Sequence, residues 1–269
     1  MKKLVKLVLL SGLALSSQFA FATPVNIADG YLGQTNSGLN NMQDVFGGTG
    51  YKVEGMDVDI NFVTGYLTVD INTYYADGDG PVDGNGNVTH NGDLFISTDG
   101  WNPYSTAGDC NGAGQCYSHD DATNGEDWEY GVVSTTGALM TGFNTVLASD
   151  AYGFNAREDQ EVLIGTGGTN VGNATVDTSN QNQDINNATL GTIRYTILLS
   201  DLGLTAQDDF TLGFHWGMTC GNDVIEGGIS SSTATRPPGS EVSEPSILAL
   251  LGLGLLIPAF RRRRLLQQA

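Results

Sequence analysis

The amino-acid sequence predicts an all-β protein, an antiparallel β-sandwich or jelly-roll-like ectodomain, from three observations. Apolar and polar residues alternate in short runs, the runs are separated by loops rich in Gly, Asn and Asp, and the stretches between them lack helical periodicity. Glycine accounts for 37 of the 269 residues, and it disfavours helices. A body of about 210 residues can bury a core as one domain.

The clearest strand signal is a pair of alternating runs around a short turn. The first run is MDVDINF, residues 56–62, and the second is YLTVDIN, residues 66–72. Each run places its apolar residues on one face: Met56, Val58, Ile60 and Phe62 in the first, and Leu67, Val69 and Ile71 in the second. The Gly-containing turn between them predicts a β-hairpin with one face in the core and the other in water.

Six further runs predict strands along the rest of the body. They are DLFIS (93–97), WEYGVVS (128–134), QEVLIG (160–165), TIRYTILLS (192–200), FTLGFHWGM (210–218) and DVIEGGI (223–229). The stretch LSDLGL, residues 199–204, predicts a single helical turn. Alternation places Trp128 and Trp216 on core-facing sides of their strands, whereas His215 points the other way and is expected to be a surface imidazole.

The first 22 residues have the order of parts found in a secretory signal peptide. Lys2, Lys3 and Lys6 precede the apolar stretch 7–15, and Ala20-Phe21-Ala22 forms an A-x-A cleavage site. We therefore expect export through the Sec translocon and cleavage by signal peptidase, with Thr23 as the first mature residue.

The exported body is strongly acidic. Residues 23–240 contain four basic residues against 28 acidic ones, a net charge of −24. Such a surface repels nucleic acid and anionic lipid, so nucleic acid is excluded as a partner, and it attracts divalent cations. Solubility outside the cell also accounts for most of this acidity without any ligand.

The cysteine pattern predicts one small disulfide ring. Cys110 and Cys116 bracket the loop CNGAGQC, and export makes disulfides possible, so we expect these two residues to pair. The alternative, two nearby thiols that do not pair, stays open. Cys220 is then either free and buried or bonded to one of the others.

The C-terminal segment combines a short apolar span with a basic end. Residues 247–260 number 14, and as a helix of about 1.5 Å per residue they would span roughly 21 Å, short of a hydrocarbon core of about 30 Å. Arg261, Arg262, Arg263 and Arg264 would hold the C-terminus in the cytoplasm. A short transmembrane helix with a strong stop favours transient anchoring in the inner membrane over a permanent anchor.

The stretch SEPSILALLGLGLLIPAFRRRR resembles the PEP-CTERM sorting signal of exported surface proteins of Gram-negative bacteria. The resemblance rests on a Pro-Glu-Pro-like box, here Ser243-Glu244-Pro245, followed by a Leu/Gly-rich span and an Arg cluster. It implies processing by an exosortase, a membrane transpeptidase-like enzyme, and association of the cargo with exopolysaccharide and biofilm. The first Pro of the box is Ser243 in this chain.

Two acidic loops could bind Ca²⁺ through carboxylate and amide oxygens. The first is DGDGPVDGNGN, with Asp77, Asp79, Asp83 and Asn85 as candidate ligands, and it fails the EF-hand pattern. The second is HDDATNGEDWE, with acidic residues between Asp120 and Glu129. The alternative for each is a solvated acidic turn between strands.

A carbohydrate-stacking role is the other binding hypothesis. Trp101 lies in the loop sequence DGWNPYS and is the best candidate for an exposed ring that stacks on a sugar face. Hydrolase chemistry has no recognisable motif, and the adjacent Ser118-His119-Asp120 counts for little because triads are assembled across a fold.

These observations predict four segments: a signal peptide (1–22), a β-sandwich ectodomain (23–229), a flexible linker (230–242) and a sorting signal (243–264). We expect a non-enzymatic surface or extracellular-matrix protein with a structural or adhesive role. A Ca²⁺-dependent carbohydrate-binding module is the alternative, and a secreted glycan-acting enzyme is the third hypothesis.

Overall fold

The computed structural model describes residues 24–33, 43–75, 88–104, 114–151, 157–179, 189–205 and 208–231. All of them belong to one compact unit, Ala22–Arg236. The expected signal peptide and sorting signal lie outside the described residues, and so does the expected linker apart from its first two residues. In the described ranges, none of the helices has the length and apolar character needed to cross a membrane.

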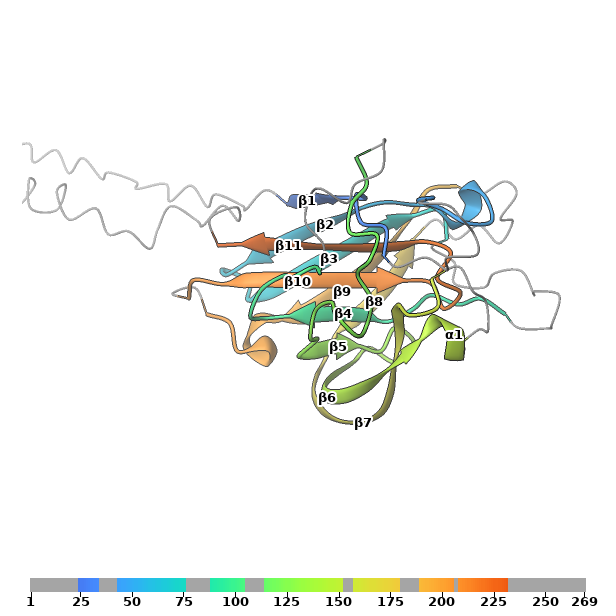
Figure 1. Cartoon of the computed structure of the whole chain (residues 1–269). Coiled ribbons are helices and arrows are strands. Elements are labelled where there is room, and N and C mark those ends of the chain that lie inside the picture. The colour runs from blue at the N-terminus through green and yellow to red at the C-terminus, as the bar shows by residue number, and fades with distance from the viewer. Residues whose placement is uncertain are drawn as a thin grey trace, which may run out of the picture. The chain divides into compact units, whose positions relative to one another are not determined.

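The described residues form two antiparallel sheets with almost no helix, which confirms the all-β prediction (Figure 1). The first sheet has the order β1-β2-β3-β9-β8, and its strands are Val25–Ala28, Val53–Asn61, Tyr66–Thr73, Gly191–Leu198 and Thr175–Ser179. The second has the order β11-β10-β4-β5-β6-β7, and its strands are Val224–Ser230, Thr211–Gly217, Leu94–Ser97, Tyr130–Val132, Ala138–Leu147 and Glu161–Asn173. Short helical turns are η2 (Thr49–Tyr51), α1 (Ala148–Ala151) and η5 (Leu199–Leu202).

The core lies between the two sheets and takes one face of each. The first sheet contributes alternate residues of β2, β3 and β9, and the second contributes alternate residues of β4, β10 and β11. Val69, Tyr195 and Phe214 are examples of side chains that are completely buried there. Burial of apolar surface on two facing sheets is what stabilises a sandwich.

The predicted hairpin is confirmed. β2 and β3 pair antiparallel with Met56 opposite Ile71 and Ile60 opposite Leu67, and these residues are buried. The single helical turn predicted at residues 199–204 is η5. The six other predicted runs coincide with β4, β5, β7, β9, β10 and β11, although β7 extends to Asn173, far beyond the predicted run.

Three strands were not predicted, namely β1, β6 and β8. The sequence of β6, ALMTGFNTVL, and the second half of β7 are rich in Gly, Thr and Asn and lack regular alternation. These two strands form a long ribbon with three register shifts, and much of it is partly or fully exposed. Backbone pairing rather than side-chain burial therefore holds this ribbon, and a hydrophobic pattern cannot reveal it.

One polar link crosses the apolar core. The hydroxyl of Tyr195, in the first sheet, lies 2.8 Å from Ser134 Oγ and accepts a hydrogen bond from Trp216 Nε1 at 3.2 Å. Ser134 also donates its backbone N–H to the buried carboxylate of Asp93. The link fixes how the two sheets are placed against each other, because buried polar groups must find partners.

The core assignment predicts opposite results for two neighbouring residues on β9. Ile197 is completely buried, whereas its neighbour Leu198 is 37% exposed. Ile197→Ala should lower the free energy of unfolding by about 2–5 kcal/mol because it leaves a cavity, and Leu198→Ala by less than about 0.5 kcal/mol. Urea unfolding of the two variants measures this. Similar losses for both would mean that β9 does not face the core as described.

Candidate functional site

The second sheet has an outer face that carries polar residues. Leu212, Phe214 and Trp216 of β10 point into the core, so Gly213, His215 and Gly217 point outward. In register, His215 lies opposite Glu226 on β11 and Phe95 on β4. The outward-facing residues of three adjacent strands therefore meet around one imidazole.

This outer face is covered by loops and is not exposed to solvent. The described residues between β4 and β5, 98–104 and 114–129, include the green segment of Figure 1 that crosses in front of β11 and β10. Its part around Cys116 pairs with the N-terminal segment, since Leu32 N–H donates to Cys116 O at 2.9 Å and Cys116 N–H to Gly30 O at 2.6 Å. The sequence positions involved are far apart, so the cover could not be read from local patterns.

A pair of glycines makes room for this cover. Gly213 and Gly228 lie opposite each other in register on the outer face. A Cβ atom on Gly228 would come within 2.7 Å of Trp101 Cβ, and one on Gly213 within 2.8 Å of the Gly100 carbonyl oxygen. Only glycine lets the loop backbone at residues 100–101 approach the sheet this closely.

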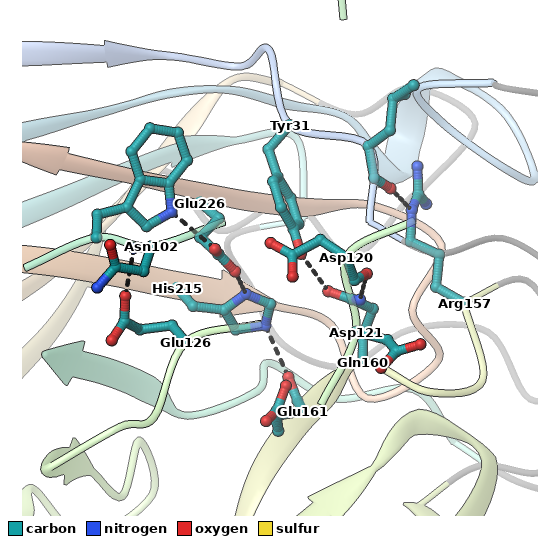
Figure 2. Close-up of polar contacts among 12 residues, drawn as sticks. Tyr31, Asn102, Asp120, Asp121, Glu126, Arg157, Gln160, Glu161, His215 and Glu226 are labelled. Carbon is teal, nitrogen blue, oxygen red and sulfur yellow. Dashed lines mark hydrogen bonds and ion pairs between the residues drawn. The ribbon is translucent and has the colours of Figure 1, made fainter. Parts of the chain in front are cut away.

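His215 is completely buried under the cover, so the expectation of a surface imidazole was wrong. Figure 2 shows its ring between two acidic residues: Nδ1 lies 2.9 Å from Glu226 Oε2, and Nε2 lies 2.8 Å from the carbonyl oxygen of Glu161. The rings of Phe95 and Trp128 lie 5.8 and 5.7 Å from it. His215 does lie on the face of β10 that points away from the core, as predicted, but the loops bury that face.

The partners of His215 define where its protons are. A carbonyl oxygen only accepts, so Nε2 carries a hydrogen that it donates to Glu161. Nδ1 and the Glu226 carboxylate then share one proton. Burial opposes the charge on the ring, but the hydrogen bond and the charge of Glu226 outweigh it, and the pKa of His215 is raised. Glu226 therefore favours the protonated form of the His215 ring.

Glu226 also holds the loop in place. Its Oε1 accepts a hydrogen bond from Trp101 Nε1 at 2.8 Å, so the two carboxylate oxygens bind the loop and the sheet at once. The neighbouring backbone N–H of Asn102 donates to Glu126 Oε2 at 2.5 Å. Trp101 thus attaches the loop to the sheet. Its ring is partly exposed and lies edge-on to the ring of Tyr117, with the ring centres 5.2 Å apart.

Two further acidic residues approach the same centre. Burial, with the charge of Glu226 as the next contribution, raises the pKa of Asp120 to about 7. Burial also raises the pKa of Glu161 to about 7, although the charge on His215 opposes the shift. Gln160 connects Tyr31 to the segment of Asp120. The Tyr31 hydroxyl donates to Gln160 Oε1 at 3.1 Å, and Gln160 Nε2 donates to the backbone oxygen of Asp120 at 2.7 Å (Figure 2).

The acidic segment 120–129 does not gather its side chains into one ligand set. Asp121 Oδ1 accepts hydrogen bonds from the backbone and hydroxyl of Thr123 and so closes its own turn. Glu126 binds the backbone of Asn102, and Glu129 binds that of Thr98. These carboxylates hold loop backbone in place. Neither the Ca²⁺ hypothesis nor the alternative of a solvated acidic turn predicted this role.

The guanidinium of Arg157 forms a second buried centre beside Tyr31 and Gln160 (Figure 2). All five of its N–H donors bind backbone carbonyl oxygens. The acceptors are Leu32 for Nε, Gly221 and Asn222 for Nη1, and Gln43 and Asp44 for Nη2. Arg157 thereby joins three chain segments, and its cation also lies 5.0 Å from the Phe46 ring centre.

Some of the other predicted site residues lie outside the described ranges, and the rest can be placed. Asp77, Asp79, Asp83 and Asn85 lie outside the described residues, as do Cys110 and the whole sorting signal. Cys116 is disulfide-bonded, and Cys220 is free and buried. Trp216 lies in the core as predicted, whereas Trp128 packs on the outer face against Phe95, so its core assignment was wrong.

Both ring nitrogens of His215 have partners within the protein. A general base needs a ring nitrogen free to reach a substrate, and both nitrogens of His215 are used inside a completely buried site. In Ser118-His119-Asp120, His119 is exposed while Asp120 is buried, so these two residues face different environments. Among the described residues, one group of carboxylates could hold a metal ion: Asp29, Asp44 and Asp223.

Comparison with known proteins gives no relative: no family model, no curated protein and no solved structure matches this chain.

The buried ion pair should matter far more than an exposed one. Glu226→Ala should lower the free energy of unfolding by about 3–5 kcal/mol, since it leaves His215 and Trp101 without their acceptor. Glu226→Gln should cost less, because its amide can donate to a neutral His215 Nδ1. Arg194 and Asp70 form an exposed two-pronged pair at 2.7 and 2.6 Å, and Arg194→Gln should cost less than about 1 kcal/mol.

Urea unfolding of the three variants measures these differences. Equal losses in Glu226→Ala and Arg194→Gln would contradict the role given to the His215–Glu226 pair.

The raised pKa values predict that the protein is less stable at pH 8 than at pH 5. The pKa values of Asp93, Asp120 and Glu161 are raised to about 6, 7 and 7, so the folded protein binds more protons than the unfolded chain above pH 4. Stability therefore falls as the pH rises through these values, and the raised pKa of His215 acts in the same direction.

We expect a loss of at least about 2 kcal/mol between pH 5 and pH 8, or roughly 4–8 °C in Tm. Thermal unfolding at constant ionic strength measures it, and Asp120→Asn, which cannot titrate, should reduce the difference. A Tm that stays level or rises towards pH 8 would refute the assignment.

Proposed function

We propose that this protein is an exported surface or extracellular-matrix component with a structural or adhesive role, associated with exopolysaccharide or biofilm. The observation that carries the proposal is the C-terminal sequence: the Ser243-Glu244-Pro245 box, the short apolar span and the four arginines occur in the order of a PEP-CTERM signal. The signal-peptide-like start points to the same compartment.

The proposed route begins with the Sec translocon and signal peptidase. The short span would then hold the protein briefly in the inner membrane, with the arginines on the cytoplasmic side. An exosortase would cut the tail and release the β-sandwich to the cell surface or the medium. The net charge of −24 on residues 23–240 is consistent with a soluble exported body and opposes binding to nucleic acid.

A non-enzymatic role agrees with how the interior uses its reactive groups. His215 and the carboxylates around it hold loops against the sheet, and this role accounts for their burial without a substrate. The buried thiol of Cys220 has a pKa raised to about 11 by burial, which keeps it protonated and unreactive.

A Ca²⁺-dependent carbohydrate-binding module is the second candidate. One observation favours it: Trp101, Tyr117 and Tyr104 lie on the covering loops, and Tyr104 is 61% exposed. Aromatic rings on a loop can stack on sugar faces. This candidate differs from the first because it requires the purified body alone to bind polysaccharide.

Loss of the exosortase should change the mass and location of the protein. In a strain with the enzyme, the intact mass should lack residues 1–22 and the part of the tail beyond the Ser243-Glu244-Pro245 box, and the protein should be at the surface or in the medium. In a strain without it, the tail should remain and the protein should fractionate with the inner membrane. The same tail in both strains would refute the sorting proposal.

A further inference from the structure

Three carboxylates from distant parts of the chain converge beside Arg157. Asp29 follows β1, Asp44 lies in the segment before η2, and Asp223 directly precedes β11. One oxygen atom from each lies within 4.8 Å of the others. Oxygens bound to one Ca²⁺ at about 2.4 Å can be at most about 4.8 Å apart, so this spacing fits a shared ion.

Several oxygen atoms at this place are buried without a hydrogen-bond donor. Both carboxylate oxygens of Asp29 and Oδ1 of Asp44 expose less than 1 Å² each and have no partner. The same is true of Oδ1 of Asn222, a residue that is 6% exposed and adjacent to Asp223 in the chain. Buried polar atoms of native proteins nearly always have a partner, so these atoms point to a ligand.

The nearby cations do not fill this need. Arg157 donates all five N–H groups to backbone carbonyl oxygens, so none is left for the three carboxyl groups. Lys52 forms its ion pair with Glu54 at 2.7 Å. Asp223 accepts the backbone N–H of Val53 at 2.7 Å and that of Val224 at 3.0 Å, one for each oxygen. Three carboxyl groups thus lie beside one buried guanidinium.

We propose that Asp29, Asp44 and Asp223 bind a divalent cation of the Ca²⁺ class. The ligands are oxygen atoms without any His or Cys, which favours a hard cation over zinc or copper. Burial raises the pKa of Asp29 to about 8, with the charge of Asp44 as the next cause, and burial also raises the pKa values of Asp44 and Asp223. This set is distinct from the acidic loop at Asp77, Asp79 and Asp83.

A cation there would tie the two sheets together at one edge. Asp29 leaves the first sheet, Asp223 leads into the second, and Asp44 belongs to the segment that Arg157 holds. Because the ion would bind only the folded chain, it would stabilise the fold by mass action. The proposal does not depend on the exported role: it concerns the folded body alone.

The test is thermal unfolding of the mature protein at pH 7.5, first in EDTA and then with increasing CaCl₂. At a free Ca²⁺ concentration about 100 times Kd, the Tm should rise by roughly 5–10 °C. Asp29→Asn and Asp44→Asn should each weaken the Ca²⁺ response at least about tenfold. In EDTA both variants should be as stable as the wild type or more stable, because they remove one member of a group of buried, mutually repelling carboxyl groups.

The matched control is the combined variant Asp77→Asn, Asp79→Asn and Asp83→Asn, which should keep the full response. Luminescence of bound Tb³⁺ measures affinity independently of stability, so a variant with a lowered Tm can still be read. The proposal is overturned if Ca²⁺ has no effect on the wild type, if Asp29→Asn and Asp44→Asn respond normally, or if only the control variant loses the response.

Discussion

The guanidinium of Arg157 is the interaction on which the rest of the arrangement depends. It is completely buried, and its five hydrogen bonds join the segments around Leu32, Asp44 and Asn222. The first of these segments carries Tyr31 and pairs with Cys116, so the cover over the outer face of the second sheet starts from this anchor. Residues 23–240 contain only four basic residues, and this one is used for organisation of the backbone.

Two buried acidic groups, one around His215 and one around Asp29, are stabilised in different ways. Around His215, the Glu226 carboxyl binds both the imidazole of the sheet and the indole N–H of Trp101 in the loop, and it raises the pKa of the imidazole. Around Asp29, both oxygens of that carboxyl group are buried without a hydrogen-bond donor, so the group requires a proton or a bound cation. An acidic chain that must bury part of its charge can do so only with such compensation.

The sequence predicts the parts of the fold that depend on side-chain alternation. β2, β3, β9 and β10 were found because their apolar residues face one core, whereas the β6–β7 ribbon depends on backbone pairing and left no pattern. The fate of His215 could not be predicted, since loops distant in sequence bury a face that alternation marks as polar. Asp29, Asp44 and Asp223 are nearly 200 residues apart at the extremes, and only the paired sheets bring them together. A search for carboxylates that are close together in the sequence therefore selects the acidic stretches 77–85 and 120–129 instead.

Anomalous diffraction from crystals of the mature protein soaked with Tb³⁺, a hard cation that stands in for Ca²⁺, tests the central claim most directly. The account predicts one strong peak within about 2.3–2.6 Å of oxygens of Asp29, Asp44 and Asp223, while Arg157 still donates to its five carbonyls. Arg157 turned towards the carboxylates, with no peak between them, would contradict it.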